Sequence, residues 1–179
     1  HRKVASGLSM PIGMKNSTSG DIGLALDGVY RVGQPSVLRG TDEGLHIVKV
    51  KTKGHNYAHV VLRGGNGNPN YHPGAVSKTV GMLEQAGLKP NVMIDCSHAN
   101  SGKDNNRQPA VWGDVIDQRV AGNKNIIGIM LEANHKGGSQ SFKYGTDSPS
   151  ELDPYISVTD KCIPLETNAR LIREAYSKL

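Results

Sequence analysis

Chemically reactive side chains follow four short hydrophobic runs, near the point where each run ends. Lys15 follows SMPIGM, Arg63 follows HVVL, His98 comes shortly after VMID, and Glu132 follows IIGIML. Continuous runs of this kind are typical of strands in a parallel sheet that is covered on both faces. Because ligand sites of parallel α/β folds lie at the carboxyl ends of the strands, we expect these side chains to gather at one site.

A metal-binding set can be drawn from these residues. His98, Glu132 and Asp160, which lies in a later TDK segment, would supply one imidazole and two carboxylates. Such ligands suit a divalent ion such as Mn, Fe, Co or Zn. Each residue taken alone also has an ordinary interpretation, as a loop residue or, for Asp160, as a turn or helix-capping residue.

Two cations suggest an anion pocket beside this metal. Lys15 and Arg63 follow separate runs, and the guanidinium of Arg63 can bind phosphate or carboxylate through two hydrogen bonds. Gly64 and Gly65 would let backbone amides approach the same anion. The alternative is that both cations are surface charges. Cys96 is interpreted as a small core residue and not as a nucleophile.

The segments between the runs carry helical patterns of apolar residues. Three stripes lie within 22–30, 76–84 and 111–120, and a last helix after Pro164 carries the apolar positions Leu165, Ala169, Ile172 and Tyr176. Strands and helices therefore alternate, which predicts a parallel α/β protein with right-handed crossovers. The alternating segment LHIVKVKT predicts one strand of an inserted β-hairpin at about 36–56.

Composition restricts the class of protein. A length of 179 residues with 36% hydrophobic residues suits one globular domain, and no apolar stretch is long enough to span a membrane. The net charge of +5 comes from scattered Lys and Arg with only 4% aromatic residues, which favours small anionic ligands over nucleic acid. The two cysteines suit a reducing compartment, so a cytoplasmic protein is expected.

Five motifs together point to a family. GMKNSTSGD, VVLRGGN, VMIDCSHANSGKD, IIGIMLEANHKGGSQS and SVTDKC, in this order, resemble the carboxyl-terminal half of the class I 3-deoxy-D-arabino-heptulosonate-7-phosphate (DAHP) synthases. The resemblance implies a (β/α)8 TIM barrel, of which residues 1–179 would be about strands five to eight. HRKVASGL lacks an initiator Met and is interpreted as the end of a helix closing at Gly7. We therefore expect a fragment.

The resemblance also implies an activity. This family of transferases joins phosphoenolpyruvate to erythrose 4-phosphate in a metal-dependent, aldol-like condensation that opens the shikimate pathway of aromatic amino acid biosynthesis. Carried over to this sequence, Lys15, Arg63 and Gly64 would bind phosphoenolpyruvate, and His98, Glu132 and Asp160 would bind the metal. Lys15, Arg63 and His98 would be the catalytic residues. The fragment alone is expected to be inactive.

Other readings stay open. A sister synthase of the 3-deoxy-octulosonate type would use a different phosphorylated aldose, and a non-catalytic half-barrel would serve as an assembly piece. A homo-oligomer is expected because an open parallel sheet has exposed edge strands. In the family, the hairpin insertion and the neighbourhood of Leu8 and Ser9 form a site for an aromatic amino acid effector. The hairpin here matches poorly, so regulation is left open.

Overall fold

A four-stranded parallel sheet forms the centre of the computed structural model, which describes residues 2–179. The strands are β1 (Ile12–Lys15), β4 (Ala58–Leu62), β5 (Val92–Asp95) and β6 (Ile126–Met130). They lie side by side in the order β1-β4-β5-β6, and every neighbouring pair is parallel. Each strand coincides with one of the predicted hydrophobic runs, so the predicted parallel α/β architecture is confirmed.

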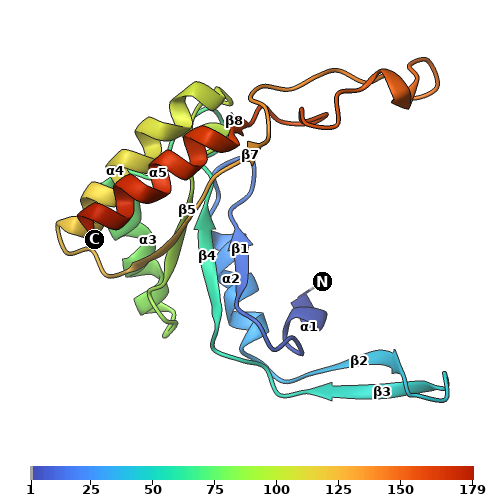
Figure 1. The fold of residues 1–179 in the computed structure, drawn as a ribbon. Coiled ribbons are helices and arrows are strands. Elements are labelled where there is room, and N and C mark those ends of the chain that lie inside the picture. Colours follow the sequence, from blue (N-terminus) through green and yellow to red (C-terminus); the bar gives the residue numbers. More distant parts are fainter. Residues whose placement is uncertain (1) are drawn as a thin grey trace.

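Four helices connect and cover these strands. They are α2 (Gly23–Val32), α3 (Pro73–Gln85), α4 (Gln108–Val120) and α5 (Leu165–Lys178). Figure 1 shows α3, α4 and α5 grouped together on one side of the sheet. All five residues of β4 are buried, as expected for a central strand between apolar neighbours. The core therefore ends where the strands end, and polar loops begin there.

The apolar positions named for the last helix are not the ones that it buries. In α5 the buried residues are Leu171 and Ala175, whereas Ile172 is 52% exposed and Tyr176 is 87% exposed. Leu165, also among the named positions, is 48% exposed. The helix carries two adjacent apolar stripes, and periodicity alone does not show which of them packs against the chain.

The inserted hairpin is present as predicted. β2 (Ser36–Thr41) and β3 (Ile47–Thr52) are antiparallel over their full lengths and project from the body of the molecule (Figure 1). The short helix α1 (Arg2–Ala5) lies near the base of the hairpin, where the Ser6 and Thr52 hydroxyls are 2.6 Å apart. The amide of Gly7 donates to the carbonyl of Val4 just after α1, which agrees with the predicted helix end, although His1 lies outside the described residues.

A second, smaller sheet follows β6. β7 (Ala133–Asn134) and β8 (Ile163–Pro164) pair in parallel, which the sequence analysis did not anticipate. The chain between them, which includes the short 3-10 helix Pro149–Glu151, forms a long arm (orange in Figure 1). Gln140 secures the base of this arm, since its Nε2 donates to the carbonyls of Asp153 and Ile156 at 2.6 and 2.8 Å. Within residues 2–179 no helix is long and apolar enough to cross a membrane.

Candidate functional site

His98 occupies the centre of the site. It opens the 3-10 turn His98–Asn100 directly after β5 with φ +55°, a left-handed conformation that is uncommon for a residue with a Cβ. Its Nδ1 lies 2.9 Å from Asp95 Oδ2 and 2.7 Å from Ser97 Oγ, and the side chain is only 15% exposed. These contacts fix the ring and leave Nε2 to face the other strand-end residues.

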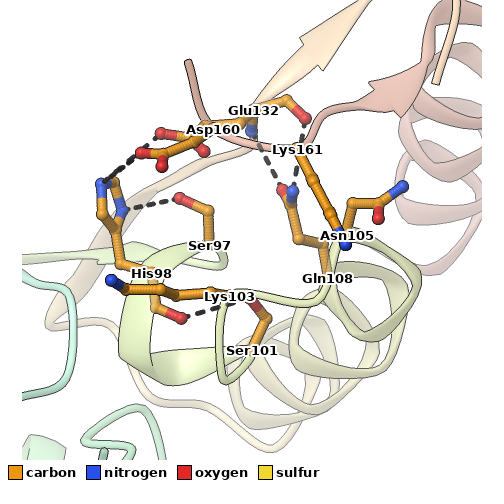
Figure 2. A pocket seen from close by; sticks show the side chains of 9 residues that line it. All are labelled: Ser97, His98, Ser101, Lys103, Asn105, Gln108, Glu132, Asp160 and Lys161. Atoms are coloured by element: carbon orange, nitrogen blue, oxygen red, sulfur yellow. Dashed lines mark hydrogen bonds and ion pairs between the residues drawn. The ribbon is translucent and has the colours of Figure 1, made fainter. Parts of the chain in front are cut away.

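Two carboxylates face Nε2 of His98. Glu132 Oε1 lies at 3.5 Å and Asp160 Oδ2 at 3.7 Å, and one ligand atom from each of the three residues lies within 4.8 Å of the other two (Figure 2). Glu132 follows β6, whereas Asp160 comes from the return of the long arm. One imidazole nitrogen and two carboxylate oxygens at this spacing fit a divalent transition-metal ion. The structure thus brings the three predicted ligands together.

The electrostatics of this group favour a cation. Burial raises the pKa of Glu132; the nearby His98 lowers it, and the negative charges of Asp160 and Asp95 raise it again, so that it lies above its usual range. The carboxylates therefore repel one another in the absence of a compensating charge. A divalent ion between them would offset that repulsion.

Asp95 connects the metal-binding group to Lys15. Its side chain is fully buried, and Oδ2 accepts a hydrogen bond from Lys15 Nζ at 2.7 Å while also contacting His98. Burial raises the pKa of Asp95, but the hydrogen bonds from Lys15 and Ser97 lower it by more, so the pKa lies below its usual range. No role was predicted for Asp95 from the sequence, although an acidic residue that ends an apolar strand was a usable signal.

Arg63 and Gly64 follow the central strand β4. Arg63 Nε is buried and has no hydrogen-bond partner among the described residues, which is costly unless a ligand supplies an acceptor. Gly64 has φ +70°, and a Cβ there would lie 2.8 Å from both the Ala99 Cβ and the Asn68 carbonyl oxygen. The Gly64 amide donates to Asn70 Oδ1 at 2.7 Å. This amide is thus engaged inside the protein, and the role of Gly64 in anion binding stays a prediction.

Glu132 is held by a residue that sequence reasoning missed. Gln108, at the start of α4, is 1% exposed, and its side chain accepts from the Glu132 amide at 3.0 Å and donates to the Glu132 carbonyl at 3.3 Å. The amide of Ile163 also donates to that carbonyl at 2.9 Å. Nothing in the sequence marks Gln108, because its partner lies on a different element. Figure 2 shows Gln108 beside Glu132 in the same pocket.

Among the described residues neither cysteine belongs to the metal-binding group, although the Cys162 thiol donates to the Asp160 carbonyl at 3.6 Å. Cys96 is fully buried in the core, which confirms its interpretation as a core residue, and burial together with the Asp95 charge raises its pKa. Burial also raises the pKa of Cys162. Neither thiol is therefore disposed to ionise at neutral pH.

Comparisons with known proteins identify the family of this chain. A sequence model of the DAHP synthetase I family matches residues 1–173. The chain is 43% identical along its whole length to the Tyr-sensitive phospho-2-dehydro-3-deoxyheptonate aldolase of Salmonella typhimurium, of which it covers 49%. It is 40% identical over 97% of its length to the Phe-sensitive enzyme of Escherichia coli, of which it covers 48%.

A solved structure supports the same assignment. The phospho-2-dehydro-3-deoxyheptonate aldolase of Francisella tularensis superposes with a TM-score of 0.88 at 35% identity, over 99% of this chain and 50% of that one. The chain thus spans about half the length of the relatives described here. With a family match over nearly its whole length, the chain belongs to the DAHP synthetase I family.

Proposed function

We propose that this chain carries the metal- and phosphoenolpyruvate-binding half of a 3-deoxy-7-phosphoheptulonate synthase. The reaction would join phosphoenolpyruvate to erythrose 4-phosphate in the first step of the shikimate pathway. The observation that carries the proposal is the convergence of His98, Glu132 and Asp160 at the strand ends, in a chain of the DAHP synthetase I family.

The metal would be held by this trio. His98 Nε2 and the carboxylates of Glu132 and Asp160 are the proposed ligands of a divalent ion such as Mn, Fe, Co or Zn. When bound, the ion would supply a Lewis acid for the aldehyde oxygen of erythrose 4-phosphate. The chain contributes the orientation, since Asp95 and Ser97 hold the far side of the imidazole.

Lys15 and Arg63 would bind phosphoenolpyruvate. The Lys15 side chain is 36% exposed and its Nζ donates to Asp95 at 2.7 Å, and Arg63 brings a buried Nε that has no hydrogen-bond partner among the described residues. Together they would neutralise the phosphate and carboxylate and aim C3 of phosphoenolpyruvate at the aldehyde carbon. A bond forms between those carbons, water adds at C2, and the C2–O bond to phosphate breaks. Gly64 would contribute by lacking a side chain beside this pocket.

The four parallel strands would be strands five to eight of a (β/α)8 barrel, with residues 1–179 as one half-barrel. Two observations support this: the chain spans about half of its relatives, and β1 and β6 are edge strands of the sheet. The remaining strands would close the sheet and complete the erythrose 4-phosphate pocket. We therefore expect no turnover from residues 1–179 alone.

The experiment that tests this function measures loss of phosphoenolpyruvate with erythrose 4-phosphate, with Mn²⁺ or with a chelator. Residues 1–179 would be assayed alone and joined to the other half of the Salmonella typhimurium relative. We expect chelator-sensitive turnover only in the joined protein. Turnover with a five-carbon phosphorylated aldose in place of erythrose 4-phosphate would indicate the octulosonate-type alternative. A folded joined protein without turnover on either aldose would indicate a non-catalytic assembly piece.

An effector site is proposed at the base of the hairpin. A hollow of about 470 Å³ is lined by Leu8 and Ser9 together with Leu38 and Val50 of the two hairpin strands. The Tyr-sensitive and Phe-sensitive names of the relatives favour an aromatic amino acid as its ligand. Titration with tyrosine and with phenylalanine tests it, because Ser9→Trp should fill the hollow and remove binding of either one.

A further inference from the structure

Three asparagines link the loops that follow β1, β4 and β5, and the proposed chemistry uses none of them. Asn16 and Asn100 are each 2% exposed, and Asn70 is half-buried between them. Asn16 and Asn100 belong to the KN and SHAN segments of the family motifs. We call Asn16, Asn70 and Asn100 the amide clamp.

The clamp holds the backbone on the amino side of Arg63. Asn100 Nδ2 donates to the Leu62 carbonyl at 3.1 Å, and the Arg63 amide donates to Asn16 Oδ1 at 2.9 Å. Asn100 Nδ2 also donates to the Asp95 carbonyl at 2.8 Å, which ties the end of β4 to the end of β5. The peptide group between Leu62 and Arg63, at the end of β4, is therefore held by asparagines from the loops that follow both neighbouring strands, β1 and β5.

The clamp also holds the backbone on the carboxyl side. The Gly64 amide donates to Asn70 Oδ1 at 2.7 Å, and Asn16 Nδ2 donates to the Gly64 carbonyl at 3.0 Å. The three asparagines are also joined to one another. The backbone amide of Asn70 donates to Asn100 Oδ1 at 2.7 Å, and the side-chain Nδ2 of Asn70 donates to Asn16 Oδ1 at 3.3 Å. Side-chain amides therefore fix the peptide groups that flank Arg63.

The side chain of Arg63 makes this arrangement informative. Its Nε is buried and has no hydrogen-bond partner among the described residues, so no hydrogen bond at that atom from this part of the chain orients the guanidinium. The direction of the side chain is then set largely by the position of its own Cα. Hydrogen bonds from buried amides define such a position sharply, since breaking one leaves a buried polar group unpaired.

We propose that the amide clamp positions Arg63 by holding its backbone. The clamp thereby directs the guanidinium toward the anion and leaves the guanidinium donors available to bind it. This inference rests on the proposed role of Arg63 in binding phosphoenolpyruvate. Asn70 is the member to test, because it holds the Gly64 amide and is not fully buried. Asn68 is the matched control, since it lies in the same loop and, within residues 2–179, its side chain bonds only to the Asn66 carbonyl.

The experiment compares anion binding with metal binding in the full chain. Phosphoenolpyruvate would be titrated by calorimetry in the presence of Mn²⁺, and Co²⁺ binding would be followed by its visible absorption. We expect Asn70→Ala to weaken phosphoenolpyruvate binding about tenfold, in line with a lost hydrogen bond, and to leave Co²⁺ affinity unchanged. Asn68→Ala should change neither by more than about twofold. Asn70→Ser replaces Asn70→Ala if the latter fails to fold, as judged by Trp112 fluorescence.

The other outcomes separate the two claims. Equal loss of both affinities in Asn70→Ala would show that the clamp only supports the fold, and would overturn the inference. Normal phosphoenolpyruvate binding in Asn70→Ala, with binding lost in Arg63→Ala, would also overturn it while leaving the proposed function intact. If Arg63→Ala binds phosphoenolpyruvate normally, or the unaltered chain does not bind it, the proposed role of Arg63 fails and the inference fails with it.

Discussion

The same pair of residue types occurs in two regions of the molecule with different consequences. In the hairpin loop, His46 Nδ1 lies 3.2 Å from Asp42 Oδ2, and at the strand ends His98 Nδ1 lies 2.9 Å from Asp95 Oδ2. The His46 side chain is 79% exposed, whereas that of His98 is 15% exposed. Exposed pairs contribute little, so the surroundings and not the residue types distinguish a site from a surface contact.

The surroundings differ in a second way. Asp95 also receives a hydrogen bond from Lys15, and His98 also faces Glu132, so each member of the buried pair has another partner. The hairpin loop instead exposes large apolar side chains, among them Leu45 at 81% and Ile47 at 79%. The reactive side chains therefore lie together where several strands end at the buried core, whereas the projecting hairpin carries exposed apolar side chains.

The largest expected effect comes from removing the buried histidine. His98→Ala should weaken Co²⁺ binding by roughly 100-fold or more and abolish synthase turnover in a complete barrel, because it removes a proposed metal ligand. Circular dichroism should show a retained fold. His46→Ala is the matched control and should bind Co²⁺ normally. Unchanged metal affinity in His98→Ala would remove the metal assignment.

The sequence predicted the sheet because its signal is local. Each strand is a continuous apolar run, and the polar residue that follows it marks the strand end, as Lys15 and Arg63 show. The three metal-binding candidates were predicted through spacing and family resemblance together. Gln108 and the amide clamp were not predicted, since most of their hydrogen bonds join residues that are distant in sequence, as in the pairs Gln108–Glu132 and Asn16–Arg63.

A second test compares leucines from the two regions. Leu62→Ala, in the fully buried β4, should lower the free energy of unfolding by about 2 to 5 kcal/mol through lost burial and a residual cavity. Leu45→Ala, in the exposed hairpin loop, should change it by less than about 0.5 kcal/mol. Urea unfolding followed by circular dichroism measures both. Similar losses in the two variants would mean that the hairpin loop is buried in solution.

A third test compares arginines. Arg63→Lys keeps the charge but loses the planar two-donor geometry, so the phosphoenolpyruvate KM of a complete barrel should rise about tenfold with a smaller change in kcat. Arg39→Lys in the exposed strand β2 should leave both parameters unchanged. Steady-state assays with varied phosphoenolpyruvate give the comparison. An unchanged KM in Arg63→Lys would remove Arg63 from the proposed phosphoenolpyruvate site.

The arm and the helix α5 show where periodicity fails. The parallel pairing of β7 with β8 is only two residues long on each side, too short to leave a pattern in the sequence. In α5 the apolar residues form two stripes, and the stripe named from the sequence was the more exposed one. Asp160 does lie near His98, as residue type, spacing and family resemblance together predicted, although no periodic signal marks the arm that carries it.

The smallest expected effect concerns pH and again compares two histidines. His59 in β4 is 6% exposed, and burial lowers its pKa from 6.5, with a hydrogen bond to the Tyr57 carbonyl opposing the shift. Below pH 6.5 the unfolded chain therefore binds more protons at this position than the folded chain does. The contribution of neutral, buried His59 to the free energy of unfolding is complete above pH 6.5. It is lost as the pH falls toward the pKa of His59 in the folded chain.

The measurement is the melting temperature between pH 7 and pH 5. We expect the unaltered chain to lose a few degrees over this range, since about 1 kcal/mol shifts the Tm of a chain this size by roughly 2 to 4 °C. His59→Gln should lose less, whatever its Tm at pH 7, while the exposed His46→Gln should follow the unaltered chain. The exposed His46→Gln variant controls for the loss of one histidine, so the difference between the two variants isolates the burial of His59. Parallel curves for all three would show that burial of His59 does not oppose its protonation.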